Sequence, residues 1–427
     1  MLDIRRVRHE PEEVKRALGR RGSPELPDFV DEVLALDETR RAAIGEVNDL
    51  KARRNEASKR IGALKRTGGD AEDLIVSMRA LGDRIGELDE AIRANEARVE
   101  EILMGIPNLP LNEVPDGGPE CNRVVSTWGE PRAFAFPPRP HWEIGEALGI
   151  LDLPRGSKIS GSGFPVLRGA GARLQRGLIN WFLDVHTGEN GYEELRVPYL
   201  VNRDSLTGTG QLPKFADELY MAERDGLWLI PTAEVPVTNL HRDELLSADE
   251  LPVRYTAYSP CFRREAGAAG KDTRGLLRVH QFDKVELVRY ERPERSSQGL
   301  EELTRHAEIL LERLGLHYRR VCLASGDLGF SSAMTYDLEV WAPGVEKWLE
   351  VSSCSVFTDY QARRANLRFR PAHGEKPEFV HTLNGSALAL PRVVAALLET
   401  CQEADGSVAL PEVLHAYVGS RRLASPA

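Results

Sequence analysis

A long run of residues between Asp28 and Met104 constrains the fold more than any other part of the sequence. It contains no proline and a single aromatic residue, Phe29. Its apolar residues recur at a four-three spacing, and the pattern reverses around the sequence KRTGGDAED. Such a spacing is typical of helices that pack together along one seam. We therefore predict two long antiparallel helices over residues 28–104, joined by a tight turn.

Thirteen seam positions follow this spacing, with Arg40 and Arg54 filling two gaps in the first helix. They are Leu36, Ala43, Val47, Leu50, Ala57, Ile61 and Leu64, followed by Leu74, Met78, Leu81, Ile85, Leu88 and Ile92. A helix of roughly 36 residues is about 55 Å long, because each residue adds 1.5 Å. We expect this hairpin to project as an arm rather than fold into a globule.

The two halves of the arm carry opposite charge. Residues 51–66 contain one acid, Glu56, and a larger set of cations, namely Lys51, Arg53, Arg54, Lys59, Arg60, Lys65 and Arg66. The returning helix, residues 70–104, has ten acids and four bases. A charged run on a helix is usually a solvated face. A cationic stripe on a projecting arm also suits contact with nucleic-acid phosphates.

Composition sets wider limits. A chain of 427 residues is expected to form two or three domains. No apolar run approaches the roughly 20 residues that span a bilayer, and the N-terminus has no signal-like pattern, so a cytoplasmic protein without membrane contact is expected. The net charge of −10 argues against indiscriminate nucleic-acid binding. The cysteines lack zinc or disulfide spacing and favour buried thiols; they are Cys121, Cys261, Cys322, Cys354 and Cys401.

A linker follows the helices. The sequence MGIPNLPLNEVPDGGPE has four prolines and three glycines, which places a domain boundary near Leu111. Beyond it, alternating strand-like runs are mixed with helices, and the sequence ARLQRGLINWFLDVHTGENGYEELRVPYLV predicts a helix that runs into a strand containing Pro198. No strand–helix–strand rhythm with a glycine-rich phosphate loop occurs. We predict an α+β fold with a mainly antiparallel sheet.

The sequence CFRREAGAAGKDTRGLLRVHQFDKVEL combines two predicted strands with a long loop of small residues. Alternation would place Arg263 and Glu265 on one face of the first strand, and a polar set on one face of the second. That set is Arg278, His280, Phe282, Lys284 and Glu286. The loop suits an adaptable flap over a ligand. Taken alone, the strand pair also fits an exposed sheet face with ion pairs.

Two further stretches favour a ligand site. WLEVSSCS places Glu350, Ser352 and Ser353 in an otherwise apolar strand, and HTLNGSALALPRVVAALLE places Arg392 at the start of an apolar helix. An arginine there opposes the helix dipole, so an anion is expected nearby, unless the side chain reaches back to solvent. Together with Arg263 and Arg278, Arg392 would supply three fixed positive charges. With Glu350 as the acid, this set suits the binding of a triphosphate with a divalent metal.

With these stretches in place, the chain resembles the bacterial-type seryl-tRNA synthetases, which are class II aminoacyl-tRNA synthetases, along nearly its full length. Residues 169–202 resemble motif 1, residues 261–288 motif 2 and residues 381–400 motif 3, while IPTAEVPVTNLH resembles the loop that closes over serine. The resemblance implies an N-terminal tRNA-binding domain, residues 1–110, and a catalytic domain, residues 111–427. It also implies a homodimer with motif 1 at the interface.

The resemblance implies an activity as well: ATP-dependent activation of L-serine and its transfer to tRNA(Ser), and to tRNA(Sec) where present. ATP and Mg²⁺ are expected, and zinc is not. Ala387 and Pro391 stand where glycines are common in the family. A paralogue specialised to resist a serine-mimicking inhibitor, and a paralogue that loads a carrier protein, remain alternatives. A third alternative is a coiled-coil scaffold with a decayed catalytic domain, but such a protein would not need Glu265, Glu286, Glu350 and Arg392 together.

The resemblance also assigns residues, with Arg263 and Arg392 as catalytic residues. ATP would bind to Arg263, Arg264, Glu265, Arg278, Val279, Phe282, Glu350, Val351, Ser352, Ser353 and Arg392. Serine would bind to Thr232, Ala233, Glu234, Arg263, Glu286, Asn384 and Ser386. tRNA would contact Lys51, Arg53, Arg54, Lys59 and Arg60. The metal ligands would be Glu350 and Ser353, whose odd spacing requires a bulge or bend if both touch one ion.

Overall fold

The computed structural model describes residues 1–266 and 274–425. Most of the flap predicted in motif 2, residues 267–273, lies outside the described residues. The chain divides into two compact units. One, the helical unit, comprises residues 1–19 and 23–107, and the other, the sheet unit, comprises residues 20–22 and 108–427.

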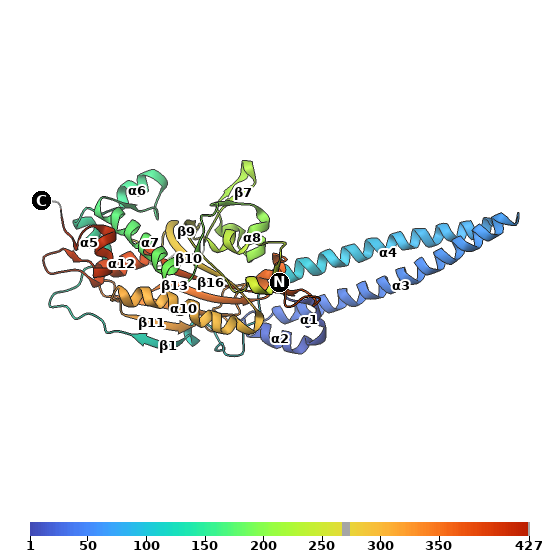
Figure 1. Cartoon of the computed structure of the whole chain (residues 1–427), viewed down its shortest axis with the longest axis horizontal. Helices are drawn as coiled ribbons and strands as arrows, with labels where there is room; N and C mark the ends of the chain where they lie inside the picture. The colour runs from blue at the N-terminus through green and yellow to red at the C-terminus, as the bar shows by residue number, and fades with distance from the viewer. Residues whose placement is uncertain (267–273, 426–427) are drawn as a thin grey trace. The chain divides into compact units, whose positions relative to one another are not determined.

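Long helices dominate the helical unit, and α3 and α4 lie side by side as an antiparallel pair (Figure 1). Its helices are α1 Ile4–His9, α2 Pro11–Gly19, α3 Leu26–Arg66 and α4 Glu72–Gly105. The buried part of their seam consists of Ala43, Val47, Leu50, Ile85 and Leu88. The predicted helix pair is therefore confirmed. Toward the turn the seam residues Ala57, Ile61 and Leu64 are only half-buried.

Ion pairs join α3 and α4 beside the seam. Arg40, at one of the gaps in the apolar spacing, has its Nη1 atom 3.0 Å from Glu96 Oε1 on α4. The Nε atom of Arg84 lies 3.0 Å from Glu46 Oε1 on α3. Arg40 therefore belongs to the contact between the helices, which accounts for its place in the seam.

An eight-stranded sheet forms the centre of the sheet unit, in the order β1-β11-β12-β13-β16-β10-β9-β4. In chain order the strands are β1 Arg123–Trp128, β4 Glu193–Glu194, β9 Val253–Phe262, β10 Gln281–Glu291, β11 Tyr318–Cys322, β12 Met334–Ala342, β13 Lys347–Thr358 and β16 His381–Ala389. Every neighbouring pair is antiparallel except β4 and β9. This arrangement confirms the predicted α+β class.

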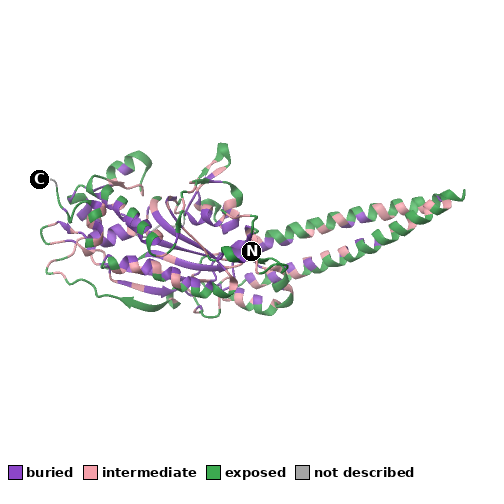
Figure 2. Ribbon diagram, viewed as in Figure 1, coloured by how far each residue is buried: buried purple, intermediate pink, exposed green. Residues whose placement is uncertain are grey.

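Side-chain alternation separates the two faces of this sheet. On β10, Val285 and Leu287 enter the main apolar core, whereas Lys284 and Glu286 point into a cavity on the opposite face. The core is formed with α7 Ala170–Gly188, α10 Ser296–Arg313 and α12 Leu390–Thr400. Figure 2 shows the strands as a mostly buried layer. The polar set on β10 is thus held on a rigid floor.

Shorter elements surround the sheet and its helices. The helices are α5 His141–Ala147, α6 Leu153–Ser160, α8 Arg203–Thr209, α9 Glu234–Thr238, α11 Tyr360–Arg364 and α13 His415–Val418. The small sheets contain β2 Leu151–Asp152 with β3 Val166–Leu167, β5 Leu200–Val201 with β6 Met221–Ala222 and β7 Leu227–Leu229, β8 Leu245–Ser247 with β14 Arg368–Arg370 and β15 Glu378–Phe379, and β17 Val408–Ala409 with β18 Arg422–Leu423. None of the helices in the described ranges is long and apolar enough to cross a bilayer.

The predicted strand through Pro198 is wrong. The structure has two short strands, β4 and β5, with Pro198 in the irregular segment between them. β4 pairs with β9 in the large sheet and β5 pairs with β7 in a small one, and Pro198, which has no N–H group to donate, lies in neither strand. The preceding helix is present as α7.

Candidate active site

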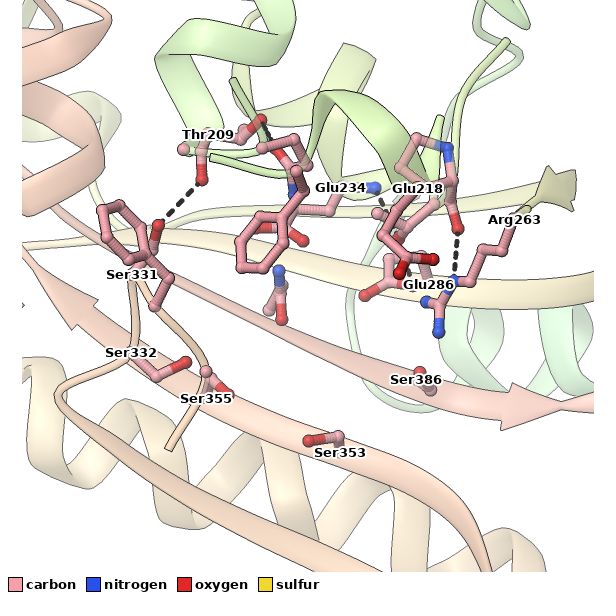
Figure 3. Close-up of a pocket in the computed structure, with 18 of the residues that line it drawn as sticks. Thr209, Glu218, Glu234, Arg263, Glu286, Ser331, Ser332, Ser353, Ser355 and Ser386 are labelled. Carbon is pink, nitrogen blue, oxygen red and sulfur yellow. Dashed lines mark hydrogen bonds between the residues drawn. The ribbon is translucent and has the colours of Figure 1, made fainter. Parts of the chain in front are cut away.

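A cavity of about 620 Å³ opens on the polar face of the sheet. Strands β10, β13 and β16 contribute its floor, and the segments around α8 and α9 contribute its sides (Figure 3). A smaller hollow of about 200 Å³ shares six lining residues with it. These are Arg263, Glu265, Arg278, Lys284, Glu350 and Ser386. The two hollows therefore form one continuous site.

A buried polar network occupies one part of the cavity. The Nζ atom of Lys284 donates to Thr232 Oγ1 at 2.9 Å and also forms an ion pair with Glu286. Thr232 Oγ1 in turn donates to Glu286 Oε2 at 3.1 Å, and it accepts from the backbone N–H of Glu234 at 3.2 Å. Glu286 is thus held in one orientation by two donors.

Glu234 is the second carboxylate of this network. Burial, and then the negative charge of Glu286, raise the pKa of Glu234 to about 7. The Nε2 atom of Gln361 donates to Glu234 Oε1 at 2.7 Å, and Thr382 Oγ1 fixes the other end of the Gln361 amide at 2.7 Å. Because two acids lie close to a single lysine, the network favours a ligand that carries a positive charge.

Strand pairing places the other residues predicted to bind serine beside these acids. Ser386 on β16 lies directly opposite Glu286 on β10, and Asn384 lies opposite Val288. Both Ser386 and Asn384 line the cavity. Ala233 is fully buried and is not among the residues that line it. The serine set is therefore brought together, apart from Ala233.

The motif 2 arginines lie at the other part of the site, but not on strands. β9 ends at Phe262 and β10 begins at Gln281, so the prediction that Arg263, Glu265 and Arg278 belong to the strands is wrong. Glu265 has a backbone φ of 51°, which ends the extended conformation. All three side chains still line the cavity.

Ion pairs and ring contacts organise these groups. Arg278 forms an ion pair with Glu265. The Cζ atom of Arg263 lies 5.2 Å from the centroid of the Phe282 ring, and its Nε atom donates to Pro231 O at 3.3 Å. Phe282 and Val279 line the smaller hollow. Arg264 lines neither hollow; its backbone N–H donates to Glu218 O at 2.9 Å.

Arg392 enters the site from the first turn of α12, as the sequence predicts. Its Nε atom donates to Leu277 O at 3.0 Å, and its Nη1 atom donates to Glu350 O at 2.8 Å. The Nη1 atom also lies 3.4 Å from Glu350 Oε2. Arg392 therefore joins motif 3 to the end of the motif 2 loop and to β13.

The bulge expected between Glu350 and Ser353 is present in β13. Leu338 pairs with Ser352 and Glu339 with Glu350, so Val351 is an extra residue in the ladder. Glu350 and Ser353 consequently both line the cavity. Val351 and Ser352 are buried and do not line it; Ser352 Oγ donates to Ser386 O at 2.5 Å.

A second carboxylate lies beside Glu350 and Ser353. Asp337 lies opposite Ser353 in the β12–β13 ladder, and its Oδ1 atom is buried without a hydrogen-bond partner among the described residues. Burial, and then the charge of Glu350, raise the pKa of Asp337 above its ordinary value. A hydroxyl, a carboxylate and an unsatisfied buried oxygen form a donor set that fits a hard cation such as Mg²⁺.

Sequence patterns did not identify several residues of the cavity, namely Thr209, Gln211, Glu218, Lys284, Ser331, Ser355 and Phe357. Lys284 was placed on the polar face of its strand but was given no role. The others come from segments far apart in the chain. Only the buried polar residues on strands, such as Lys284, had a signal that local alternation could have revealed.

The residues predicted to bind tRNA lie on α3. Lys51, Arg53, Lys59 and Arg60 are exposed, and Arg54 is half-buried. Lys51 Nζ is 3.8 Å from Asp89 Oδ1 on α4. The remaining four have no ion pair within the described residues, which leaves their charges available to a ligand.

Two family models match the chain. Residues 1–110 match the seryl-tRNA synthetase N-terminal domain, and residues 218–401 match the class II tRNA synthetase core domain shared by the enzymes for G, H, P, S and T. The sheet unit, with its antiparallel sheet and its cavity, therefore has the core of a class II aminoacyl-tRNA synthetase.

Whole-chain comparisons narrow this class. The serine–tRNA ligase of Gemmatimonas aurantiaca is 57% identical, and the match covers 99% of this chain and 100% of that protein. The crystal structure of the seryl-tRNA synthetase from Pyrococcus horikoshii complexed with ATP has a TM-score of 0.97 at 39% identity, with 100% of both chains covered. The chain belongs to the seryl-tRNA synthetase family and has the serine–tRNA ligase activity of that family.

A more distant relative is also a seryl-tRNA synthetase that is similar over the whole chain. The cytoplasmic serine–tRNA ligase of Naegleria fowleri, solved in complex with AMP, has a TM-score of 0.90 at 29% identity and covers 100% of this chain. The match of residues 1–110 to a seryl-tRNA synthetase domain also disfavours a paralogue that loads a carrier protein, since such a protein needs no tRNA-binding arm.

Proposed function

We propose that the cavity on the sheet is the place where L-serine and ATP react, with serine at Glu234 and Glu286 and the nucleotide between Phe282 and Arg392. The observation that carries this proposal is the position of both residue sets in one continuous site. Phe282 and Glu286 lie on the same face of β10, four residues and therefore about 13 Å apart. That separation suits an adenine ring at one end and an amino acid at the other.

The serine side chain and the serine ammonium group would use different acids. Glu286 and Ser386 would bind the hydroxyl group, and Glu234, with Thr232 and Asn384, would surround the ammonium group. Arg263 would bind the serine carboxylate and the α-phosphate. The net negative charge of the two acids beside one lysine suits an ammonium group that enters a buried site.

On the nucleotide side, Glu265 would accept a hydrogen bond from the adenine amino group, and Arg278 and Arg392 would face the outer phosphates. The related Pyrococcus horikoshii structure is a complex with ATP. Glu265 pairs with Arg278, and Glu350 lies beside Arg392. Binding of a triphosphate would therefore exchange two protein ion pairs for contacts to the nucleotide.

The chemistry needs positioning and charge neutralisation rather than a covalent protein intermediate. The serine carboxylate attacks the α-phosphorus in line, and pyrophosphate leaves while Arg263 and Arg392 stabilise the developing charge. The terminal ribose hydroxyl of the tRNA then attacks the seryl-adenylate and expels AMP. Glu350 and Ser353 would hold Mg²⁺, with Asp337 behind them. When bound, this ion neutralises phosphate charge.

The arm would supply the contacts to tRNA. Arg53, Lys59 and Arg60 are exposed on one helix, and with Lys51 and Arg54 they would meet phosphates of tRNA(Ser), and of tRNA(Sec) where it is present. A paired helix supports such a stripe at fixed spacing. We extend the proposal to a cytoplasmic location, where charged tRNA is used.

The catalytic unit would work as a homodimer through motif 1. A groove of about 520 Å³ runs along α7 and is lined by Gln175, Ile179 and Leu183, with Tyr258 and Asp283 from the sheet. The Tyr258 hydroxyl donates to Asp283 Oδ1 at 3.0 Å. This partly apolar groove supports an interface at α7. Sedimentation equilibrium of wild type and of Ile179→Glu tests it: a monomeric wild type contradicts the dimer.

One assay tests the main proposal. Purified protein should exchange radioactive pyrophosphate into ATP only when serine is present, and alanine should not replace serine. Serine-dependent exchange that survives Glu234→Ala and Glu286→Ala together would place serine elsewhere. Exchange without any amino acid would contradict the proposed chemistry.

A further inference from the structure

A buried arginine outside the catalytic motifs lies beneath one end of the cavity. Arg21 belongs to the short segment 20–22 of the sheet unit and is 9% exposed. Its Nη2 atom donates to Gly329 O at 2.8 Å and to Phe330 O at 2.9 Å. Its Nη1 atom lies 3.4 Å from both Ser325 O and Leu328 O. One guanidinium group thus gathers four backbone carbonyls.

Stability alone does not account for Arg21. No ion pair joins it to a carboxylate in the described part of the chain, and burial lowers its pKa to about 10, so it stays charged at neutral pH. A buried cation without a counter-ion is costly compared with an apolar side chain. What the planar guanidinium group provides is fixed geometry for several acceptors at once.

The carbonyls that Arg21 binds lie within a helix-like turn and just after it. Ala324 O accepts from Asp327 N at 2.9 Å and from Leu328 N at 3.1 Å, after which the turn ends. No helix continues beyond this turn, although Gly329 O still accepts from Ser332 N at 3.0 Å, and carbonyls at the end of such a turn favour a nearby cation. Arg21 therefore terminates the turn and directs the residues that follow it, 329–332.

Asn108 holds the same segment from a second position in the chain. Its backbone N–H donates to Phe330 O at 2.9 Å, and its Nδ2 atom donates to Ser331 O at 2.9 Å and to Phe357 O at 2.7 Å. Asn108 is only 4% exposed, so water does not compete for these bonds. Arg21 and Asn108 together bind the backbone carbonyls of residues 329–331.

Residues 329–332 line the cavity, and we call them the wall segment. Figure 3 shows Ser331 and Ser332 at the end of the cavity away from Arg263, with Glu234 and Glu286 between. A Cβ atom at Gly210 would lie 2.1 Å from Ser331 Oγ, so the wall segment packs directly against the end of α8. A small displacement of the wall segment cannot be absorbed by empty space there.

Hydrogen bonds continue from the wall segment to the acid proposed to bind the serine ammonium group. Ser331 Oγ donates to Thr209 O at 3.1 Å. The same carbonyl accepts from Gln361 Nε2 at 3.2 Å, and Gln361 Nε2 also donates to Glu234 Oε1 at 2.7 Å. The position of Thr209 O therefore links the wall segment to the orientation of Glu234.

We propose that Arg21 and Asn108 are positioning residues for serine binding, because they fix the wall segment and, through Thr209 and Gln361, the carboxylate of Glu234. This inference rests on the proposed role of Glu234. It assigns to two residues outside motifs 1 to 3 an effect on the amino-acid side of the site and none on the nucleotide side.

The neighbouring arginine supplies a matched control. Arg20 also binds backbone carbonyls of the sheet unit, with Nη1 3.1 Å from Leu111 O and Nη2 2.6 Å from Val114 O, and it forms an ion pair with Asp116. None of these partners lines the cavity. Arg20→Gln and Arg21→Gln thus remove similar hydrogen bonds to backbone carbonyls, but only Arg21→Gln removes those that hold the wall segment.

The experiment measures pyrophosphate exchange as a function of serine and of ATP. Arg21→Gln should raise the KM for serine about tenfold or more, with the KM for ATP within about twofold of wild type, since charged hydrogen bonds are lost on one side only. Arg21→Lys keeps the charge but has fewer donors, so its KM for serine should lie between those of wild type and Arg21→Gln. Arg20→Gln should leave the KM for serine within about twofold of wild type.

A second variant tests the same wall segment without removing a cation. Asn108→Asp keeps the size of the side chain but turns a carboxylate oxygen toward the carbonyls of Ser331 and Phe357, so it should also raise the KM for serine. Unfolding temperatures and ATP binding, measured for every variant, show that the catalytic unit is folded.

The outcomes are distinct. An unchanged KM for serine in folded Arg21→Gln overturns the inference, as does an equal rise in Arg20→Gln and Arg21→Gln, because that would reflect general loosening. Wild-type exchange that does not depend on serine, or on Glu234, would instead contradict the proposed function on which the inference rests.

Discussion

Lys284 and Glu286 form an ion pair on β10, and their side chains are only 6% and 2% exposed. Lys284 also donates to Thr232, which in turn donates to Glu286. The three groups thus form a closed network at the base of the proposed serine site. Removing one member of a buried charge pair leaves the other uncompensated, which costs about 3–5 kcal/mol.

Lys284→Met should therefore lower serine activation by about 100-fold or more, since Glu286 would lose its buried counter-ion and one of the two donors that orient its carboxylate. Pyrophosphate exchange measures the activity, and urea unfolding measures the stability. The double variant Lys284→Met with Glu286→Gln should regain stability but not activity. Lys158→Met, at an exposed position of α6, is the control. Near-wild-type exchange by Lys284→Met would show that the pair has no part in serine binding.

Arg392 contacts both the end of the motif 2 loop and β13. Arg392→Ala and Arg263→Ala should each destroy activation without unfolding the chain. Loss of a preorganised donor to a developing negative charge costs about 3–4 kcal/mol of transition-state stabilisation. Single-turnover formation of adenylate measures this loss. Near-wild-type turnover by either variant would remove that arginine from the catalytic set.

Glu234 should make stability depend on pH. Its pKa is about 7 in the folded chain, above the ordinary value of 4.5, so the folded state holds the proton more tightly than the unfolded chain. Stability of the empty enzyme should therefore fall as pH rises from about 4.5 to about 7, by on the order of 3 kcal/mol at most, and then stay level. Glu234→Gln should remove this loss.

Unfolding at pH 5 and pH 8 checks the sign. Glu234→Gln should be more stable than wild type at pH 8 and close to wild type at pH 5, whereas Glu223→Gln, at an exposed acid, should show no such difference. Equal effects at both pH values would mean that Glu234 does not titrate in this range. In wild type, serine binding should weaken below about pH 7, because a protonated Glu234 no longer pairs with the ammonium group.

The arm should serve charging but not activation. Replacement of residues 30–102 by a short linker should leave serine-dependent exchange largely intact while tRNA charging collapses, because the cavity residues all lie in the sheet unit. If both activities fell together in a folded protein, this division of roles would be wrong.

The cations of α3 allow a finer test. Neutralising Lys51, Arg53 and Arg54 should weaken tRNA binding and lower the slope of log affinity against log salt by about one unit per lost phosphate contact. Lys51 should contribute least, since it lies near Asp89. Arg84→Gln is the control, because Arg84 is already paired with Glu46 and Glu87. An unchanged slope in the triple variant would exclude this stripe from the tRNA contact.

Local patterns predicted the parts of the fold that local forces determine. The spacing of Ala43, Val47 and Ile85 was sufficient for the arm, because each helix needs an apolar seam to pack. The bulge at Val351 was expected because Glu350 and Ser353, at an odd spacing, can contact one metal ion only if the strand is irregular between them. Arg263 and Arg278 were misplaced on strands, since alternation cannot show where a strand ends.

Long-range contacts account for what the sequence did not reveal. Thr209, Gln361 and Glu234 meet through hydrogen bonds between α8, α11 and α9, and nothing in their local sequence indicates these partners. Arg21 is similar, because its partners are backbone carbonyls about 300 residues later. Backbone acceptors carry no residue type that a motif could display.

Selection of serine over alanine should depend on Glu286, whose carboxylate is oriented by Thr232 and Lys284 and lies opposite Ser386. Alanine would leave these buried groups without a partner, and sites built for a hydroxyl can reject the analogue lacking it by about 10⁴-fold or more. Threonine keeps the hydroxyl and must be excluded by its extra methyl, which costs only about 1–3 kcal/mol.

Glu286→Ala should therefore cut serine activation steeply and narrow the gap between serine and alanine, while the discrimination against threonine changes less. Glu286→Gln, which keeps the size of the side chain, separates the loss of charge from the loss of packing. Exchange measured with serine, alanine and threonine on wild type and both variants gives the three ratios. An unchanged serine-to-alanine ratio in Glu286→Ala would show that another group binds the hydroxyl, and Ser386 on the facing strand would then be the next residue to substitute.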